Sequence, residues 1–555
     1  MSEDRPEKTG EQSPVETTRA SSRAGILRSA GLMTAFTLLS RILGLVREQV
    51  RAALIGTSAA SDAFGVATML PNLFRRLFAE GAMTAAFLPV FSEFLAKGDE
   101  ESTNAFLSRF ITLLTCVVAA FTLLGVAVTP WIIDTFFATE FQNVSGKVAL
   151  TIALTEWMWP YLFFVSVAAV LQAVLNAHKI FGPSAFTPVL LNACIIGCGL
   201  GLATTLPDPS YGLVAGFVVG GVVQLGFQVP YLLRWTSARI RIDFHFSDPG
   251  VQRVLRIMAP GVFAAGIYQI NVFVSQWIAS SLPGGSIASL QYSIRLQELV
   301  LGLFVVSVAQ VILPTLSEQT ARDDHSGVVD TLAHASQLMV WVTIPATVAL
   351  MLIGGPILRL LFQFGAFDAD STAMTNQALF FHALGLLPIA LSRIQSQVFF
   401  AYKDLKTPTL VAAVVMVVHV GLCYGLAVPM GMNHAGIALA GSVAALLNTV
   451  IFVPVLRQRI GALGGQALTT FALKVSAATA LMGGALWGYD RLWSAAGVET
   501  HMGIGLWVAG AIVGGGGIYV VACQLFGINE LGELLRSMRR RRSTPAKGQE
   551  SEQGE

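Results

Sequence analysis

Long apolar runs separated by short polar turns fill most of this 555-residue chain. A run of about 20 apolar residues is long enough to cross a bilayer as a helix. The pattern predicts fourteen such helices, at 28–55, 62–96, 106–133, 148–176, 184–205, 211–233, 252–281, 287–320, 330–353, 374–400, 409–430, 434–456, 468–490 and 502–526. The predicted fold class is an all-α polytopic membrane protein.

Composition agrees with a membrane protein. The chain is 54% hydrophobic and 12% charged, with a mean hydropathy of +0.65, whereas soluble domains average about 25% charged residues. Residues 1–24 are polar without an apolar core, which predicts a disordered tail rather than a signal peptide. Residues 531–555 include Arg539–Arg542 and predict a basic tail near anionic lipid. The net charge of +2 is too small to indicate a nucleic-acid partner.

Lysine and arginine are concentrated in alternate loops, which sets orientation in a membrane. If the N-terminus is cytoplasmic, the external loops carry Lys147, Arg359 and Arg491. The cytoplasmic loops and adjoining helix ends carry a larger set: Lys97, Lys179, Arg234, Arg239, Arg241, Arg253, Arg256, Arg322, Lys403, Lys406, Arg457 and Arg459. This bias and the even helix count predict that both termini are cytoplasmic.

The chain contains an internal repeat. The sequence Leu-Pro-x-x-Ser-Glu at 88–93 recurs 225 residues later at 313–318, and the same offset relates Pro183 to Pro408. Each unit holds six predicted helices, so the halves share one orientation. We therefore predict two six-helix lobes, 25–235 and 236–460, followed by two further helices within 461–530. The repeat makes 62–96 and 287–320 equivalent, each about 50 Å long at 1.5 Å per residue.

Six arginines lie inside these apolar segments: Arg41, Arg47, Arg51, Arg75, Arg76 and Arg295. An arginine at the centre of a spanning helix costs about 2.5 to 3.5 kcal/mol. We therefore expect these side chains to face a wet interior cleft rather than lipid. Guanidinium groups bind phosphate oxygens in pairs, so the predicted cargo is anionic.

The first helices leave alternatives open. Arg41 and Arg47 are about 240° apart on an ideal helix and share a face only if the helix bends, which Gly44 between them permits. Arg41 and Arg47 are each either a hydrogen-bond donor in the cleft or the partner of a carboxylate. Arg51 lies near the external end of the helix and can snorkel to the membrane surface. Asp62 opens its helix, either as an N-terminal acidic residue or as a gate or salt bridge to a cleft arginine.

The remaining charged positions are weighed in the same way. Adjacent Arg75 and Arg76 point about 100° apart, so one is expected in the cleft and the other at an interface or against Glu80. Arg295 and Glu298 are three residues apart and can pair, as a switch or as a static structural pair. Arg393 lies near the cytoplasmic end of its helix and either snorkels or reaches the cleft.

Other polar and small residues favour structural roles. The five cysteines and the single imidazoles of His382 and His419 lie in apolar segments without a metal-ligand set, so no metal is predicted. Gly212, Gly216 and Gly220 form a close-packing face. The chain has no HExxH or GxSxG motif, and its Asp368-Ala369-Asp370 is interpreted as a helix start. An enzyme and a membrane scaffold are both disfavoured.

The stretch from the first to the second helix closely resembles the MurJ (MviN) lipid II flippases. It reads SRILGLVR at 40–47, SDAF at 61–64 and LPNLFRRLFAEGA at 70–82. Further matches are Arg295 with Glu298, the Gln363–Gly365 stretch and the Asp404–Pro408 stretch. The resemblance runs from about residue 28 to 530. Such flippases belong to the same superfamily as multidrug exporters of the MATE type.

The resemblance implies a bacterial inner-membrane flippase, not an enzyme, that moves lipid II outward for peptidoglycan synthesis. It places the required arginines on Arg41, Arg47, Arg75 and Arg295, the required aspartate on Asp62 and a basic position on Arg393. No cofactor is implied. The partners implied are lipid II and membrane lipid, with cell-wall synthesis proteins as candidates. Some members hold sodium through acidic and amide side chains, but the helix at 409–430 has no Asp, Glu or Asn, which disfavours a sodium site.

Two other transporters remain as alternatives: a MATE-like exporter, or a flippase of another polyprenyl-linked glycan. An exporter of cationic drugs would need carboxylates in the cleft, whereas the predicted cleft is basic. The sequence therefore favours a lipid II flippase that works by alternating access, with the cationic cleft binding the diphosphate.

Overall fold

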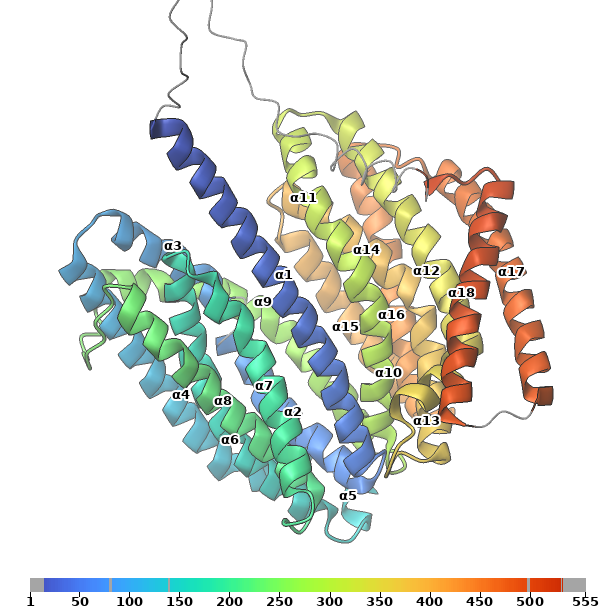
Figure 1. Ribbon diagram of the computed structural model, residues 1–555, viewed down its shortest axis with the longest axis horizontal. Coiled ribbons are helices and arrows are strands. Elements are labelled where there is room, and N and C mark those ends of the chain that lie inside the picture. The colour runs from blue at the N-terminus through green and yellow to red at the C-terminus, as the bar shows by residue number, and fades with distance from the viewer. Residues whose placement is uncertain (1–13, 79–81, 138–139, 497–499, 531, 533–555) are drawn as a thin grey trace, which may run out of the picture. The chain divides into compact units, whose positions relative to one another are not determined.

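The structure is a computed structural model that describes residues 14–78, 82–137, 140–496, 500–530 and 532. The elements assigned within these residues are all helical (Figure 1). The first part of the chain forms α1 (Pro14–Ile55), α2 (Ala59–Phe78), α3 (Ala82–Ala96), α4 (Glu100–Phe136), α5 (Glu140–Asn143), α6 (Lys147–Ala177), α7 (Phe181–Leu202), α8 (Pro209–Trp235) and α9 (Pro249–Ser280). The second part forms α10 (Ser286–Val300), the π-helical turn η1 (Leu301–Val305), α11 (Val306–Ala321), α12 (His325–Phe362), α13 (Ala369–Leu384), α14 (Leu386–Ala401), α15 (Lys406–Ala427), α16 (Asn433–Ile460), α17 (Gly465–Ala496) and α18 (His501–Leu525).

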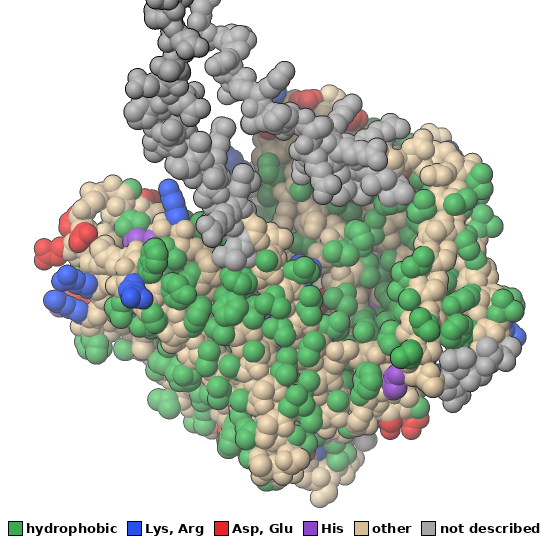
Figure 2. All heavy atoms as spheres, in the orientation of Figure 1, with side chains coloured by type: hydrophobic (Ala, Val, Ile, Leu, Met, Phe, Trp, Pro, Cys, Tyr) green, Lys and Arg blue, Asp and Glu red, His purple; other side chains and the backbone are tan. Residues whose placement is uncertain are grey.

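Many of these helices suit a bilayer. Among the described residues, ten are long and apolar enough to cross one, or eleven if the bent pair α13 and α14 counts as one span. Figure 2 shows hydrophobic side chains over the sides of the helices, with most charged side chains in that view near helix ends. The all-α membrane class is confirmed, whereas the count of fourteen spans stays a prediction.

Several helix limits differ from the predicted ones. α1 begins at Pro14, within the segment predicted as a polar tail. The predicted helix 287–320 is present as Ser286–Ala321, 36 residues long, with η1 inside it. The predicted continuous helix 62–96 is instead described as α2 and α3, and residues 79–81 between them, including Glu80, lie outside the described residues. Arg539–Arg542 also lie outside them.

The predicted helix 374–400 is broken by 43° at Gly385. The carbonyl oxygens of Phe381 and His382 accept side-chain hydrogen bonds from Ser442 Oγ at 2.6 Å and Gln297 Nε2 at 2.5 Å. These donors compete for the carbonyls that a continuous helix would use. A Cβ at Gly385 would lie 2.7 Å from Ser442 Oγ, so this packing requires glycine.

The described residues form two compact units. Unit 1 comprises the described residues within Met1–Leu54, Val66–Ile133 and Ala149–Gly266, and unit 2 comprises those within Ile55–Gly65, Asp134–Val148 and Ile267–Glu555. The short segments 55–65 and 134–148 thus belong to unit 2, although the chain on either side of each belongs to unit 1. The lobe limits expected from the repeat stay a prediction.

The repeat is visible in local geometry. The turns before α7 and α15 each have a lysine with positive φ, at 63° for Lys179 and 57° for Lys403. In both turns the next backbone N–H donates at 2.9 Å to the carbonyl of the residue five positions earlier, Ile180 to Leu175 and Asp404 to Phe399. Pro183 and Pro408 then lie in the first turns of α7 and α15, where a proline needs no hydrogen-bond partner for its nitrogen.

In unit 1, α7 and α8 pack at close range through the predicted glycine face. A Cβ at Gly212 would lie 3.0 Å from Cys198 O, and a Cβ at Gly216 would lie 2.5 Å from Ile195 Cα. A Cβ at Gly220 would lie 2.6 Å from Leu191 Cδ1. The backbones approach so closely because these positions carry no side chain.

We predict that Gly216→Ala destabilises the protein by about 1 to 3 kcal/mol, because the added methyl group overlaps backbone atoms that cannot rotate away. The thermal unfolding midpoint of the purified protein in detergent measures the effect. The matched control is Gly226→Ala on the same helix, whose Cβ would meet nothing within 4 Å. Equal midpoints for the two variants would contradict the close-packing interpretation.

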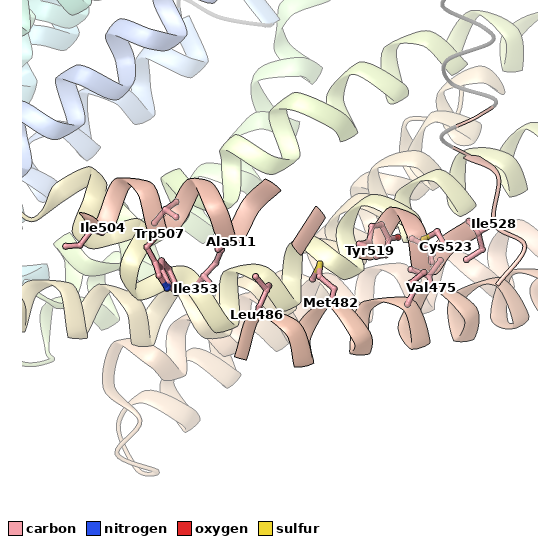
Figure 3. Close-up of a cluster of buried hydrophobic side chains, with 14 residues drawn as sticks. Ile353, Val475, Met482, Leu486, Ile504, Trp507, Ala511, Tyr519, Cys523 and Ile528 are labelled. Atoms are coloured by element: carbon pink, nitrogen blue, oxygen red, sulfur yellow. The ribbon is translucent and has the colours of Figure 1, made fainter. Parts of the chain in front are cut away.

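In unit 2, α17 and α18 pack against α12 (Figure 1). Figure 3 shows the buried side chains that join them, among them Ile353 of α12, Met482 and Leu486 of α17, and Trp507 of α18. The Tyr519 hydroxyl of α18 donates to the carbonyl of Trp341 at 2.6 Å. The two helices predicted to stand outside the repeat are therefore attached to unit 2 through α12.

Candidate substrate-binding site

Arg47 on α1 shares a carboxylate with Arg51 in unit 1. Arg47 Nη2 lies 2.6 Å from Glu48 Oε1, and Arg51 Nη1 lies 3.6 Å from Glu48 Oε2. The Arg47 side chain is 21% exposed, whereas that of Arg51 is 9% exposed. Arg51 is thus buried against Glu48, and the prediction that it snorkels is wrong.

The other contacts of Arg47 anchor α1 to α7. Arg47 Nη1 donates to Asn192 Oδ1 at 3.1 Å, and Asn192 Nδ2 donates to the carbonyl of Ser40 at 3.2 Å. α1 is helical without interruption through Gly44. Arg41 is exposed while Arg47 is half-buried, as their separation around the helix requires. The Arg47 guanidinium group is thus held by Asn192 and Glu48, whereas the Arg41 side chain is exposed.

Arg75 and Arg76 end α2 in different surroundings. Phe74, the residue before them, packs against Phe121 and Trp159 with ring centroids 4.8 and 5.8 Å away. Arg75 is half-buried and its Nε donates to Asn72 Oδ1 at 2.9 Å, whereas Arg76 is exposed. Their adjacent positions therefore give them different environments, as the 100° rotation predicts. The Glu80 contact considered from sequence lies outside the described residues.

Arg295 lies on α10 in unit 2. Its Nη1 is 2.8 Å from Glu298 Oε2, the contact that the three-residue spacing indicates, and the two side chains are 51% and 52% exposed. An exposed ion pair contributes little to stability, about 0 to 1 kcal/mol. The carboxylate can therefore be replaced by another anion at small cost. Arg393 on α14 is also exposed.

Asp62 forms a buried centre in unit 2 rather than a contact with an arginine of the predicted cleft. It is 2% exposed, and its Oδ2 accepts from Lys147 Nζ at 2.9 Å. The same oxygen accepts from the Gly285 N–H at 2.7 Å, and Oδ1 accepts from the Ala288 N–H at 3.0 Å. Asp62 thus caps α10 from a distant part of the sequence. It also pairs with Lys147, which was predicted only as part of an external loop.

Lys147 needs this carboxylate for two reasons. It is the first residue of α6, where the positive end of the helix dipole disfavours a cation, and its side chain is only 3% exposed. Its Nζ also lies 3.8 Å from the centroid of the Phe141 ring, a cation–π contact. Asp62 therefore neutralises Lys147 and the N-terminus of α10 together.

The turn before α2 is fixed in unit 2 by neighbouring contacts. Tyr292 of α10 donates to the carbonyl of Gly56 at 3.3 Å, and Thr57 donates to Ser371 Oγ at 2.8 Å. Gly56 has φ +52°, and a Cβ there would lie 2.2 Å from the Ala366 carbonyl oxygen. Asp368 caps α13, accepting from the Ser371 N–H at 2.8 Å, which confirms the helix start predicted from Asp368-Ala369-Asp370.

Comparisons with known proteins decide the family. The family profile described as "Lipid II flippase MurJ" matches residues 51–506. A "Probable lipid II flippase MurJ" of Vibrio cholerae is 34% identical over 516 residues, covering 91% of this chain and 96% of that protein. The "Lipid II flippase MurJ" of Burkholderia cenocepacia is 33% identical, covering 78% of this chain and 84% of that protein. The chain belongs to the lipid II flippase MurJ family.

Solved structures agree with this MurJ assignment. The inward closed conformation of a lipid II flippase MurJ superposes with a TM-score of 0.74 at 26% identity, over 90% of this chain and 99% of that chain. An inward-facing MATE family transporter of the MOP superfamily has a TM-score of 0.63 at 14% identity, over 80% of this chain and 99% of that chain. At this low identity the second likeness concerns the fold alone.

Two buried histidines of this MurJ member have hydrogen-bond partners, as the structural interpretation predicted. His419 Nδ1 lies 2.7 Å from Asn271 Oδ1, and its Nε2 lies 3.2 Å from Cys423 Sγ. His382 Nδ1 lies 2.9 Å from Ser293 Oγ. Within the described residues, no group of three or more His, Cys, Asp or Glu residues is placed to hold a metal ion.

The Asp404–Pro408 stretch forms the turn before α15 and its first residues. The Thr407 N–H, the Thr407 hydroxyl and Arg459 all contact Asp404 and lower the pKa of this carboxyl to about 2. Because the folded pKa is depressed, the stabilisation is fully present above the ordinary pKa of about 3.9 and is lost as the pH falls toward 2. The ion pair with Arg459, at 2.7 Å, therefore persists at neutral pH.

Sequence reasoning missed two site residues, Glu48 and Lys147. Glu48 could have been found, because it lies three residues before Arg51, a spacing that places two helical side chains on one face. Lys147 lies 85 residues from Asp62, and no local spacing connects them. In both cases the missed residue was the oppositely charged partner of a residue that the sequence had singled out, a carboxylate for Arg47 and Arg51 and a lysine for Asp62.

Proposed function

We propose that this chain moves lipid II from the inner to the outer leaflet of the bacterial cytoplasmic membrane, as a transporter and not an enzyme, with both termini cytoplasmic. The observation that carries the proposal is a set of guanidinium groups on membrane-length helices in a member of the MurJ family. Arg41, Arg47, Arg75 and Arg295 are the proposed ligands of the diphosphate. Arg76 and Arg393 are proposed accessory cations.

Binding would proceed by exchange of anions. The guanidinium groups of Arg47 and Arg295 already hold the carboxylates of Glu48 and Glu298 at 2.6 and 2.8 Å. A diphosphate presents oxygens of the same kind with greater charge, so it can take over these charge-assisted bonds without leaving an unpaired cation. Glu298 then acts as the carboxylate that returns to Arg295 when the substrate leaves.

Translocation is proposed to follow alternating access, with the prenyl tail remaining in lipid. A ligand shifts a conformational equilibrium only through unequal affinity for the two states, and the bonds to the diphosphate supply that difference. A membrane potential that is negative inside also favours outward movement of the anion, by about 2.3 kcal/mol per charge per 100 mV. Asp62 is the proposed gating residue, because it joins three segments of unit 2 through one carboxylate.

Depletion of the protein in its native cell tests the function. The expected result is that lipid II accumulates and stays on the inner leaflet, measured by its accessibility to an external probe, because this chain is the proposed route by which the head group reaches the outside. Restoring the wild-type chain should restore accessibility. Normal lipid II exposure with altered drug sensitivity would contradict the proposal and favour a MATE-like exporter. Normal lipid II exposure with another polyprenyl-linked glycan retained inside would favour a flippase of that glycan.

A further inference from the structure

Unit 1 contains a cavity of about 700 Å³ lined by residues of α2, α3, α6, α7 and α8. This volume falls in the range of about 300 to 1,000 Å³ that is typical of small-molecule sites. Its wall is mainly apolar but includes a group of amide side chains from α6 and α8: Gln172, Asn176, Gln224 and Gln228. Such a concentration of amides inside an apolar helix bundle needs an explanation, since burying a polar group without a partner is costly.

The orientation of two of these amides is fixed by their neighbours. Gln224 Nε2 donates to the carbonyl of Thr187 at 2.9 Å, and Gln228 Nε2 donates to the carbonyl of Gln224 at 3.1 Å. Because a carbonyl accepts and never donates, the nitrogen of each amide must face it. The Oε1 atoms of Gln224 and Gln228 take no part in these bonds, and an amide oxygen can only accept hydrogen bonds.

These acceptors have no partner among the described residues. Gln224 and Gln228 are 7% and 1% exposed, and their Oε1 atoms and the Oδ1 of Asn176 make no hydrogen bond there. Leaving a buried acceptor without a donor costs the free energy of its lost hydration. A ligand that brings O–H or N–H groups into the cavity would remove this cost.

The charge of the wall limits the ligand further. Arg75 is the only charged residue among the described residues that line the cavity, so a cation is disfavoured there. An uncharged group with several hydroxyl or amide donors fits the acceptors. An anionic group attached to it fits Arg75, which the proposed function already assigns to the diphosphate.

We propose that this cavity binds the glycan of the substrate, next to a diphosphate held by Arg75. The sugar hydroxyl and acetamido N–H groups would donate to Gln224, Gln228 and Asn176. This inference rests on the proposed function and adds to it a site in unit 1 that recognises the head group itself. The cavity thereby distinguishes a glycan-bearing lipid from a bare prenyl diphosphate.

The test measures binding of three lipids to the purified full-length protein: lipid II, the same disaccharide lipid without the pentapeptide, and undecaprenyl diphosphate. Gln228→Met preserves volume and flexibility but removes the acceptor. We expect about tenfold weaker binding of both glycan lipids and unchanged binding of undecaprenyl diphosphate. The matched control is Gln395→Met on α14, since Gln395 is buried as well, at 7% exposed, and has an unpartnered Oε1 but does not line the cavity.

Each other outcome overturns the glycan site. Equal losses for all three lipids would mean that Gln228 only supports the fold. No loss for any of them would mean that water alone fills the cavity. A loss that requires the pentapeptide would assign the cavity to the peptide instead. If the wild-type protein itself fails to bind lipid II, the proposed function fails, which is a result distinct from a failure of the variant alone.

Discussion

Replacing Arg295 with alanine is expected to abolish outward movement of lipid II while the protein still inserts and accumulates normally. The Arg295 side chain is 51% exposed, and Glu298, with which it forms an ion pair, is 52% exposed. Its loss therefore costs little stability. Each charge-assisted hydrogen bond to a diphosphate contributes about 1.5 to 3 kcal/mol, and a guanidinium group makes two at once. Translocation in proteoliposomes with labelled lipid II measures the effect.

Two further variants test whether the effect is specific to the Arg295 guanidinium group. Arg295→Lys keeps the charge but loses the paired geometry, so translocation should be reduced but detectable. Arg322→Ala is the matched control, because Arg322 also forms an exposed ion pair, 2.7 Å from Glu318, yet has no proposed substrate role. Normal lipid II translocation by Arg295→Ala would remove Arg295 from the mechanism.

Replacing Asp62 with alanine is expected to destabilise the protein by about 3 to 5 kcal/mol, because it leaves the buried Lys147 ammonium group without its partner. The change also removes the acceptor of the Gly285 and Ala288 N–H groups at the start of α10. Thermal unfolding in detergent, read out as the fraction of monodisperse protein, should show a lower midpoint than the wild type.

A double substitution separates charge from capping. Lys147→Met with Asp62→Asn removes both charges and keeps one acceptor oxygen, so it should recover part of the stability that Asp62→Ala loses. The control is Asp208→Asn, because Asp208 caps α8 locally through the Ser210 N–H at 2.8 Å and asparagine caps nearly as well as aspartate. A double variant no more stable than Asp62→Ala would show that the ion pair is not the main contribution.

The sequence was sufficient for features that depend on local spacing. Helix limits followed from apolar runs, and most agree with the structure within a few residues. The three-residue spacing of Arg295 and Glu298 places them on one face, and they are in contact. The cost of a guanidinium group in lipid depends only on residue type and depth, so the sequence marks the arginines as candidates for a polar cleft. Their role in binding stays a prediction.

Features that depend on distant partners could not be predicted. The break at Gly385 depends on Ser442 and Gln297, which lie outside that helix and take its carbonyls. The pairing of Asp62 with Lys147 depends on packing in unit 2. Gln224 and Gln228 were not predicted as site residues, since glutamine is uncharged and a single glutamine in an apolar helix does not indicate a binding role. Their significance comes from the cavity that they line.

The assignment of residues 55–65 and 134–148 to unit 2 has a consequence for biosynthesis. Asp62 is synthesised before Gly285, which lies 223 residues later in the chain. The carboxylate therefore lacks the helix that it caps until α10 has been synthesised. A chain cut after Gly266 would yield a C-terminal fragment that lacks Asp62 and Lys147, and only the co-expressed N-terminal fragment could supply them. Halves exchanged between related proteins should therefore function only when both short segments travel with the C-terminal half.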